Sequence, residues 1–185
     1  IPLLEAAVDG GVELRDRTPV VALAPGREAV HVGLDDGELV AGAVVVTAGA
    51  WAPRLLATVG IDLPVVPTRE TVVYLDLPAA ESLPPVIDYG GIPSGGEAGV
   101  ARAGNSAYSL AAPGKGLKAG LHHAGPVTDP DEPGVPDESV AAWVAGWAAS
   151  RYAEAGAVQG AETCVYTNTA YESFVLERPQ HAVEA

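Results

Sequence analysis

The spacing of apolar residues predicts two helices. The opening segment "IPLLEAAVDGG" repeats leucine, alanine and valine at helical spacing until a glycine pair supplies a stop. A clearer helix is expected from Asp137 or Glu138 to about Ala155, closed by Gly156. One face of this helix carries Val140, Trp143, Val144, Trp147 and Tyr152. Such a stripe is typical of a helix that packs on a core, and a tryptophan-lined ligand pocket is the alternative.

Runs of β-branched and apolar residues, broken by turn residues, predict a β-meander over residues 12–49. The turn "DDGE" carries the Asp-Gly signal of a hairpin within this stretch. Farther along, "AVVVTAGAW" (43–51) reads as a continuous apolar strand that ends in small residues. Small residues let the backbone approach a neighbour closely, and from the residues alone close packing is favoured over a bound ligand.

Three further strands are expected beyond a helix or turn at 52–60. Residues 64–77 form a long strand that Pro67 is expected to interrupt. The segment 116–125 alternates like a strand, and residues 162–178 form the last one.

The stretch 78–106 is rich in proline, glycine and serine and predicts a loop, with a short strand at "VIDYG". The whole pattern predicts an α+β fold. In this fold residues 61–165 form a mixed or antiparallel sheet, and the long helix packs on one face of it.

Charge and cysteine content narrow the function classes. The chain has 10 Lys+Arg against 24 Asp+Glu, a formal net charge of −14, which repels phosphate backbones and anionic membranes. Neither nucleic acid nor a membrane is therefore an expected partner. A single cysteine cannot form an intramolecular disulfide, and no signal peptide or long apolar run is evident. We expect a cytoplasmic protein, with no metal site.

One glycine motif is misleading. "GKGLKA" (114–119) formally matches the dinucleotide fingerprint G-x-G-x-x-G/A. That fingerprint needs a buried strand before it and a helix after it, so that the helix N-terminus meets the pyrophosphate. Here "LAAP" precedes and the strand-like "GLHHAG" follows, so no phosphate site is expected.

Four segments, in this order, resemble a known family: "VVVTAGAWAPRLL", "LPVVPTRETVVYLD", "YSLAAPGKGLKAGLHH" and "TCVYTNTAYESFVLER". The chain is similar to the central part of the monomeric sarcosine oxidase and N-methyl amino acid oxidase family. These are FAD-dependent amine oxidases of the D-amino-acid oxidase superfamily. The resemblance covers about residues 1–178, and the motifs are specific in combination.

The resemblance implies a set of FAD contacts. Cys164 matches the cysteine that is bonded through sulfur to the flavin 8α position, and Val20 resembles a residue whose backbone faces the adenine. The segment beside the FAD comprises Thr47, Ala48, Gly49, Ala50 and Trp51. Without the resemblance, a lone strand cysteine is ordinarily a small buried apolar residue.

The resemblance also implies four catalytic or substrate-side residues. Lys118 matches the lysine that assists the reaction of the flavin with oxygen, and His122 matches a substrate-side histidine. Tyr108 and Tyr166 match tyrosines of the substrate pocket, although the family usually reads Tyr-Gly-Phe/Leu-Pro where this chain reads "YSLA". Residues four or two apart share one face of a strand, which suits Lys118 with His122 and Cys164 with Tyr166. A solvated lysine is the simpler alternative.

The implied function is oxidation of a secondary or N-methyl amino acid to an imine, with oxygen as acceptor and hydrogen peroxide as product. The alternatives are an FAD-dependent dehydrogenase of the same superfamily and a non-catalytic, acidic, β-rich binding domain. The spectrum of a protein extended at both ends of this chain separates the enzymes from the binding domain, because only a flavoprotein is yellow.

The resemblance implies an incomplete FAD site. Residues 1–60 correspond to part of the FAD-binding α/β domain, residues 61–165 to the substrate domain, and 166–185 to the return toward the FAD-binding domain. The family's dinucleotide βαβ unit and its glycine-rich closing segment have no counterpart in the sequence. We therefore expect this chain alone to be an inactive central fragment that binds no FAD and leaves Cys164 as a free thiol.

Overall fold

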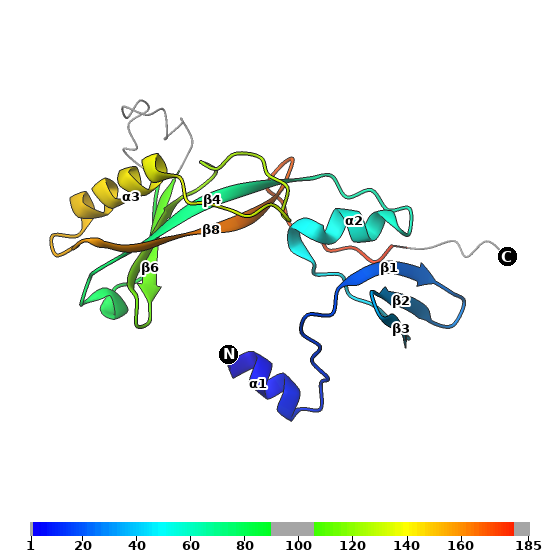
Figure 1. The fold of residues 1–185 in the computed structure, drawn as a ribbon. Helices are drawn as coiled ribbons and strands as arrows, with labels where there is room; N and C mark the ends of the chain where they lie inside the picture. The colour runs from blue at the N-terminus through cyan, green and yellow to red at the C-terminus, as the bar shows by residue number, and fades with distance from the viewer. Residues whose placement is uncertain (1, 90–105, 180–185) are drawn as a thin grey trace. The chain divides into compact units, whose positions relative to one another are not determined.

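The computed structural model describes residues 2–89 and 106–179 (Figure 1). The chain forms two compact units, residues 1–63 with 175–185 and residues 64–174. No helix in the described ranges is both long and apolar enough to cross a bilayer.

The first unit contains a three-stranded antiparallel sheet in the order β1-β2-β3. Leu34 pairs with Gly37, so the hairpin predicted at "DDGE" is confirmed with Asp35 and Asp36 as its loop residues. The opening helix is also confirmed and ends at Asp9, as the glycine pair predicted. The elements are α1 (Pro2–Asp9), β1 (Val20–Pro25), β2 (Val30–Leu34), β3 (Gly37–Ala41), η1 (Gly49–Trp51) and α2 (Ala52–Ala57).

Two strand predictions in this unit are wrong. Residues 12–19 form no strand, because the chain turns at Asp16 and Arg17, and the φ of Arg17, 50°, lies outside the extended region. The first strand begins only at Val20. Residues 43–48 form no strand, because no described strand lies beside them to complete a hydrogen-bond ladder. An apolar run predicts a strand only where the fold supplies a pairing partner.

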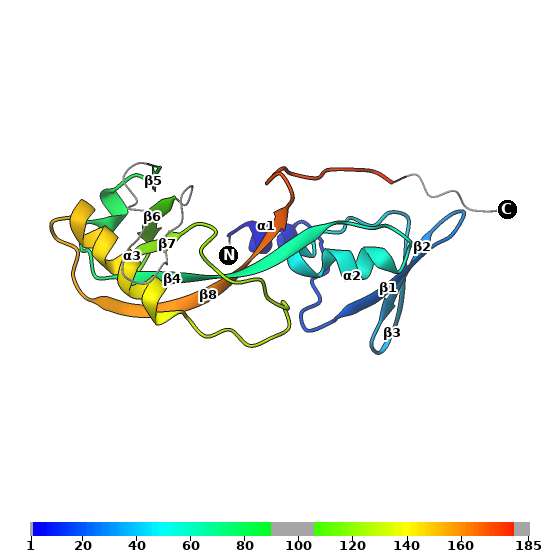
Figure 2. The same ribbon diagram turned by 90° about the horizontal axis from the view of Figure 1, so that it is seen from above.

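The second unit is a five-stranded sheet in the order β5-β6-β7-β4-β8, and every neighbouring pair is antiparallel. The long strands β4 and β8 run side by side (Figure 2). This confirms the predicted antiparallel sheet with one covering helix. The elements are β4 (Val65–Leu75), η2 (Ala80–Ser82), β5 (Val86–Asp88), β6 (Ala107–Ala112), β7 (Gly116–Leu121), α3 (Glu138–Arg151) and β8 (Val158–Thr169).

Helix α3 packs on one face of this sheet and forms the main core. Its buried residues Val144 and Trp147 lie against alternating strand residues such as Val73 and Leu121. The apolar stripe is therefore a packing face, as predicted, and Trp147 also donates a hydrogen bond from Nε1 to Asp88 at 3.0 Å. Because strand residues alternate, the other face of the sheet remains for polar side chains.

The helix ends earlier than predicted, at Arg151. Tyr152 adopts extended dihedrals, with φ −124° and ψ 107°, and its hydroxyl lies 2.6 Å from Oγ of Ser109 on β6. Its ring also packs edge-on against Trp147. These tertiary contacts end the helix before Gly156, a stop that the sequence pattern alone did not predict.

Pro67 does not interrupt β4, so the predicted interruption of this strand is wrong. It pairs with Thr167 of β8, and its carbonyl accepts a hydrogen bond from the amide of Thr128 at 3.0 Å. In an antiparallel ladder the N–H and C=O of one residue point to the same side. The missing N–H of Pro67 would therefore face Thr128 and not β8, so the β4·β8 ladder loses no bond.

Three other boundaries differ from the sequence prediction. Strand β7 ends at Leu121, so His122 begins a turn and is not part of the strand. Strand β8 starts earlier than predicted and ends at Thr169.

The glycines of "GKGLKA" form the β6–β7 hairpin, where Gly114 and Gly116 have positive φ, so the motif lacks the strand, loop and helix of a dinucleotide site. The short strand expected at "VIDYG" is β5, and residues 90–105 of the expected loop lie outside the described residues.

The capping residue Asp137 gives a test of α3. Its Oδ1 accepts hydrogen bonds from the amides of Ser139 and Val140 at 2.8 and 3.0 Å. We expect Asp137→Ala to lower the free energy of unfolding by about 1 kcal/mol, measured by urea denaturation. Glu138→Ala, in the same turn but without the cap bonds, is the matched control, and an equal loss in both variants would contradict the capping role.

Candidate functional site

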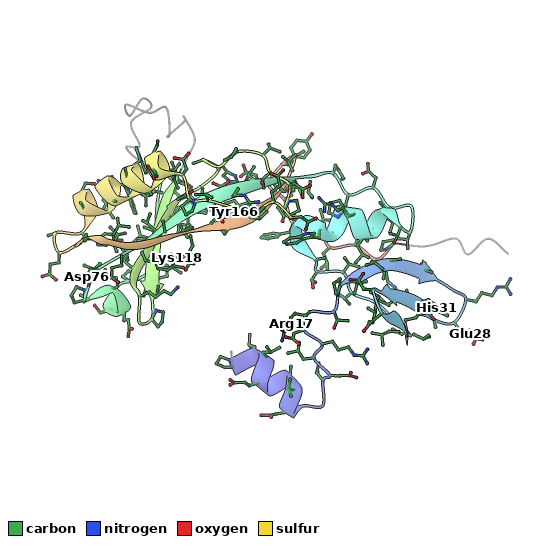
Figure 3. All side chains as sticks on the ribbon, in the orientation of Figure 1. Arg17, Glu28, His31, Asp76, Lys118 and Tyr166 are labelled. Atoms are coloured by element: carbon green, nitrogen blue, oxygen red, sulfur yellow. The ribbon has the colours of Figure 1, made fainter. Side chains whose placement is uncertain are left out.

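The face of the second sheet opposite α3 carries the predicted catalytic residues and the predicted flavin-linked cysteine. On β8, Cys164 pairs with Glu70 and Tyr166 pairs with Thr68 of β4. On the other side of β4, Lys118 pairs with Tyr74. Directly paired residues point to the same face, so these side chains share one surface. Figure 3 marks Lys118 and Tyr166 on this sheet.

Three of the predicted residues form a cluster through one hydrogen bond and a ring contact. Oη of Tyr166 lies 2.8 Å from Nδ1 of His122. The ring of Tyr108 lies 4.5 Å from that of His122, centroid to centroid. The strands of the two tyrosines are separated by β7 and β4, so the cluster spans the centre of the sheet.

A glycine makes room for Tyr108 in this cluster. Gly120 pairs with Tyr108, and a Cβ at Gly120 would lie 2.7 Å from the Tyr108 hydroxyl oxygen and 2.8 Å from two ring carbons. Real side chains do not approach so closely, so any larger residue would displace the ring. Gly120 therefore lets the ring lie across β7, and no sequence motif marks this role of the glycine.

Burial controls the protonation of the cluster. It is the main cause that raises the pKa of both Tyr166 and Tyr108. Burial also lowers the pKa of His122, and the neighbouring charge of His123 lowers it further, against the opposing carboxylates Glu70 and Glu172. At neutral pH the two phenols keep their protons and the imidazole is uncharged.

Cys164 and Lys118 are coupled through space on the same face. Burial raises the pKa of the half-buried Cys164 thiol, while the Lys118 ammonium acts to lower it. Within the described ranges, the Lys118 ammonium forms no hydrogen bond or ion pair. Lys115 is the main cause that lowers the pKa of Glu162, and the Lys118 charge contributes to it, so Lys118 acts on groups of this face without a direct ion pair.

Sequence reasoning missed Glu70. Its side chain is 1% exposed, yet it stands on the same face as Cys164. The signal was present in "TRETVV", where a carboxylate occupies an alternating position of an otherwise buried strand. A buried charge of this kind is uncommon and points to a specific set of hydrogen-bond donors.

The remaining predicted residues lie in the first unit. Val20 begins β1 and is exposed. The small-residue segment leads through η1 into α2, with Gly49 at φ 52° and the Trp51 amide donating to the Ala48 carbonyl at 3.0 Å. Of this segment, Ala50 is buried, Ala48 is half-buried, and Thr47, Gly49 and Trp51 are exposed.

The family model described as DAO, FAD dependent oxidoreductase, matches residues 2–183. The chain belongs to this family. The family predicted from the four sequence motifs is thereby confirmed, and it is an FAD-dependent one. The match also favours a flavoenzyme over the non-catalytic binding domain.

Similar proteins include several amino acid oxidases. The chain is 27% identical over 194 residues to monomeric sarcosine oxidase of Bacillus sp. (strain B-0618), covering 96% of this chain and 45% of that protein. Glycine oxidase from Geobacillus kaustophilus has a similar fold, with a TM-score of 0.73, 21% identity, and coverage of 97% of this chain and 44% of that one. Iminodiacetate oxidase from Chelativorans sp. BNC1 matches with a TM-score of 0.61, 25% identity, and coverage of 91% and 42%. The chain thus spans less than half the length of these relatives.

The donor set of the second sheet fits a flavin. One face offers a thiol at Cys164, a cation at Lys118 and hydrogen-bonding phenols at Tyr108 and Tyr166. A thiol can hold an organic ring covalently, and a cation can stabilise negative charge that forms beside it. These residue types suit the FAD of the family.

Proposed function

We propose that this chain supplies the flavin-facing and substrate-facing sheet of an FAD-dependent oxidase that acts on secondary or N-methyl amino acids. Oxygen is the electron acceptor and hydrogen peroxide the product. The observation that carries the proposal is the single sheet face that gathers Cys164, Lys118 and the Tyr108–Tyr166–His122 cluster. In this proposal residues 1–60 belong to the FAD-binding part, 61–165 to the substrate domain, and 166–185 to the return between them.

The names of two relatives support the substrate class. Sarcosine is an N-methyl amino acid and iminodiacetate is a secondary amine with two carboxylates. Both substrates place a secondary amine beside a carboxylate-bearing carbon. We extend that chemistry to this chain. Oxidation of such an amine needs one group that accepts the proton of the amine and another that accepts hydride from the adjacent carbon.

FAD, when bound, supplies the two-electron acceptor for the carbon beside the amine nitrogen. The protein residues have separate tasks around it. Cys164 would tether the cofactor through its sulfur, and Lys118 would present a positive charge where oxygen is reduced. The resemblance assigns further cofactor contacts to the small residues from Thr47 to Trp51 and to the backbone of Val20.

The tyrosine–histidine cluster handles the amine proton in this proposal. An amine near neutral pH is mostly protonated, and its nitrogen lone pair must be released before the adjacent carbon can lose hydride. The hydrogen bond between Tyr166 and His122 can run in either direction, because a hydroxyl can either donate or accept a hydrogen bond. When Nδ1–H of His122 donates to Tyr166, Nε2 is the basic nitrogen and takes up the amine proton. Tyr166 keeps the ring in place in either arrangement.

Oxygen consumption tests the proposed activity directly. A full-length protein that contains this chain and is loaded with FAD (the flavin-loaded enzyme) is mixed with N-methyl and primary amino acids, and oxygen uptake is compared with peroxide formed. The proposal expects equimolar uptake and peroxide, with faster turnover of N-methyl substrates. Turnover with an artificial electron acceptor alone would indicate the dehydrogenase alternative, and no bleaching of flavin absorbance by any amine would reject both enzymes.

The variant Tyr166→Phe tests the cluster. It removes the hydroxyl that is hydrogen-bonded to Nδ1 of His122, so the imidazole is held less firmly. We expect flavin reduction by the amine to slow on the order of tenfold, measured by rapid mixing without oxygen. Tyr171→Phe is the matched control, because Tyr171 is 90% exposed. A Tyr166 variant that reduces at the wild-type rate would remove the cluster from the mechanism.

A further inference from the structure

Glu70 is a buried carboxylate that the proposed chemistry does not use. It is 1% exposed, and the Thr68 hydroxyl donates to its Oε1 at 2.6 Å. The amides of Ala124 and Gly125 both donate to its Oε2, at 3.0 and 2.9 Å. Burial of a carboxylate is costly unless such donors compensate for the lost water, so three directed bonds indicate a built arrangement.

The two amides belong to a strained turn that follows β7. His123 has φ 57°, a left-handed conformation that is uncommon for a residue other than glycine. Successive amides beside such a residue form a concave site for an anion. A Cβ on Gly125 would overlap the Arg69 carbonyl oxygen and lie 3.0 Å from Cδ of Glu70, so the close approach requires glycine there.

Backbone hydrogen bonds hold the chain on either side of this turn but not within it. Before it, the His122 amide donates to the Ser106 carbonyl at 2.8 Å. After it, the Arg69 amide donates to the Pro126 carbonyl at 2.9 Å. Between these points, the amides of Ala124 and Gly125 both donate to the carboxylate of Glu70, and these bonds hold the turn in place.

We propose that Glu70 is a positioning residue, whose carboxylate fixes the turn His123–Gly125 and thereby holds the His122 ring against Tyr166 and Tyr108. The positional claim stands on the hydrogen bonds of the turn alone. Only its importance for turnover rests on the function proposed above for His122. Glu70 acts through His122 and contacts no substrate in this proposal.

The charge and the position of Glu70 act on His122 in opposite directions. The negative charge raises the pKa of His122, whereas the buried place in which Glu70 holds the ring lowers it. Among the described residues, the other groups that act on the ring include Tyr108 from β6, Tyr166 from β8, and His123 and Glu172. Removing the charge while keeping the position should therefore lower the pKa of His122 further. Removing both should raise it toward its ordinary value, because the ring gains water.

The experiment compares Glu70→Gln with Glu70→Ala in this chain by NMR. Glutamine has nearly the same shape, and the Thr68 hydroxyl can reverse to accept from its amide. We expect the His122 pKa to fall in Glu70→Gln and to rise in Glu70→Ala, followed on the ring protons. Exchange of the Ala124 and Gly125 amides should become about tenfold to a hundredfold faster in Glu70→Ala and change little in Glu70→Gln. Glu81→Gln and Glu81→Ala, at an exposed carboxylate of η2, should change neither quantity.

The proposal would be overturned if, in Glu70→Ala, the Ala124 and Gly125 amides exchanged at the wild-type rate and His122 kept its wild-type pKa. If Glu70→Ala unfolds, the Glu70→Gln variant decides: protected amides with a lower His122 pKa support the proposal, and unprotected amides overturn it. The flavin-loaded enzyme then separates the two claims. Flavin reduction by the amine should slow in Glu70→Ala; if the NMR shifts occur and reduction does not slow, the role of His122 fails and the positioning by Glu70 stands.

Discussion

Lys118→Met in the flavin-loaded enzyme is expected to slow the reaction with oxygen about a hundredfold while reduction by the amine changes little. The physical reason is charge. Electron transfer to oxygen builds negative charge, and the Lys118 ammonium lies on the same sheet face as Cys164 without an ion-pair partner in the described ranges. Methionine keeps much of the length of the side chain but stabilises no anion. Only the oxygen step should therefore lose a stabilising interaction.

The two half-reactions are measured separately, by stopped-flow mixing with amine under anaerobic conditions and of reduced enzyme with oxygen. Lys115→Met is the matched control. Lys115 is on the same hairpin, but its ammonium is 3.0 Å from Glu162 and lies over the ring of Tyr74. Equal slowing of both half-reactions by Lys118→Met, or an equal oxygen effect in Lys115→Met, would show that Lys118 has no specific role toward oxygen.

Cys164→Ser is expected to abolish covalent attachment of the flavin completely. Cys164 is the single cysteine of the sequence, and it faces the same surface as Lys118 and Tyr166. Burial raises the pKa of its thiol, so at neutral pH the thiol is mostly protonated and needs a ring held beside it before it reacts. Serine has nearly the same shape, but a hydroxyl is a far weaker nucleophile.

Acid precipitation of the flavin-loaded enzyme gives the readout. The wild-type pellet should stay yellow, and the Cys164→Ser variant should release its flavin to the supernatant. Thr163→Ser is the control on the same strand, because Thr163 alternates to the opposite face and should leave the attachment intact. A pellet that stays yellow in Cys164→Ser would place the attachment elsewhere and leave Cys164 as a small packing residue.

Local sequence patterns were reliable where neighbouring residues decide the structure. The first-unit hairpin with loop residues Asp35 and Asp36, the packing stripe of α3 and the existence of the long strand β4 all depend on contacts that the pattern itself encodes. The four motifs also sufficed for the family. In β8, the two-residue spacing of Cys164 and Tyr166 predicted that they share a face, because the period of a strand is fixed.

Tertiary structure decided which distant residues meet. The strand order β5-β6-β7-β4-β8 brings Tyr108, His122 and Tyr166 together, although pairing order is absent from any local pattern. The same dependence explains the errors: residues 43–48 lack a described pairing strand, and Tyr152 leaves α3 to reach Ser109. Glu70 could not be assigned a role from sequence, because its partners are backbone amides of a turn more than fifty residues away. Backbone amides exist at almost every position, so only the fold determines which of them converge on a carboxylate.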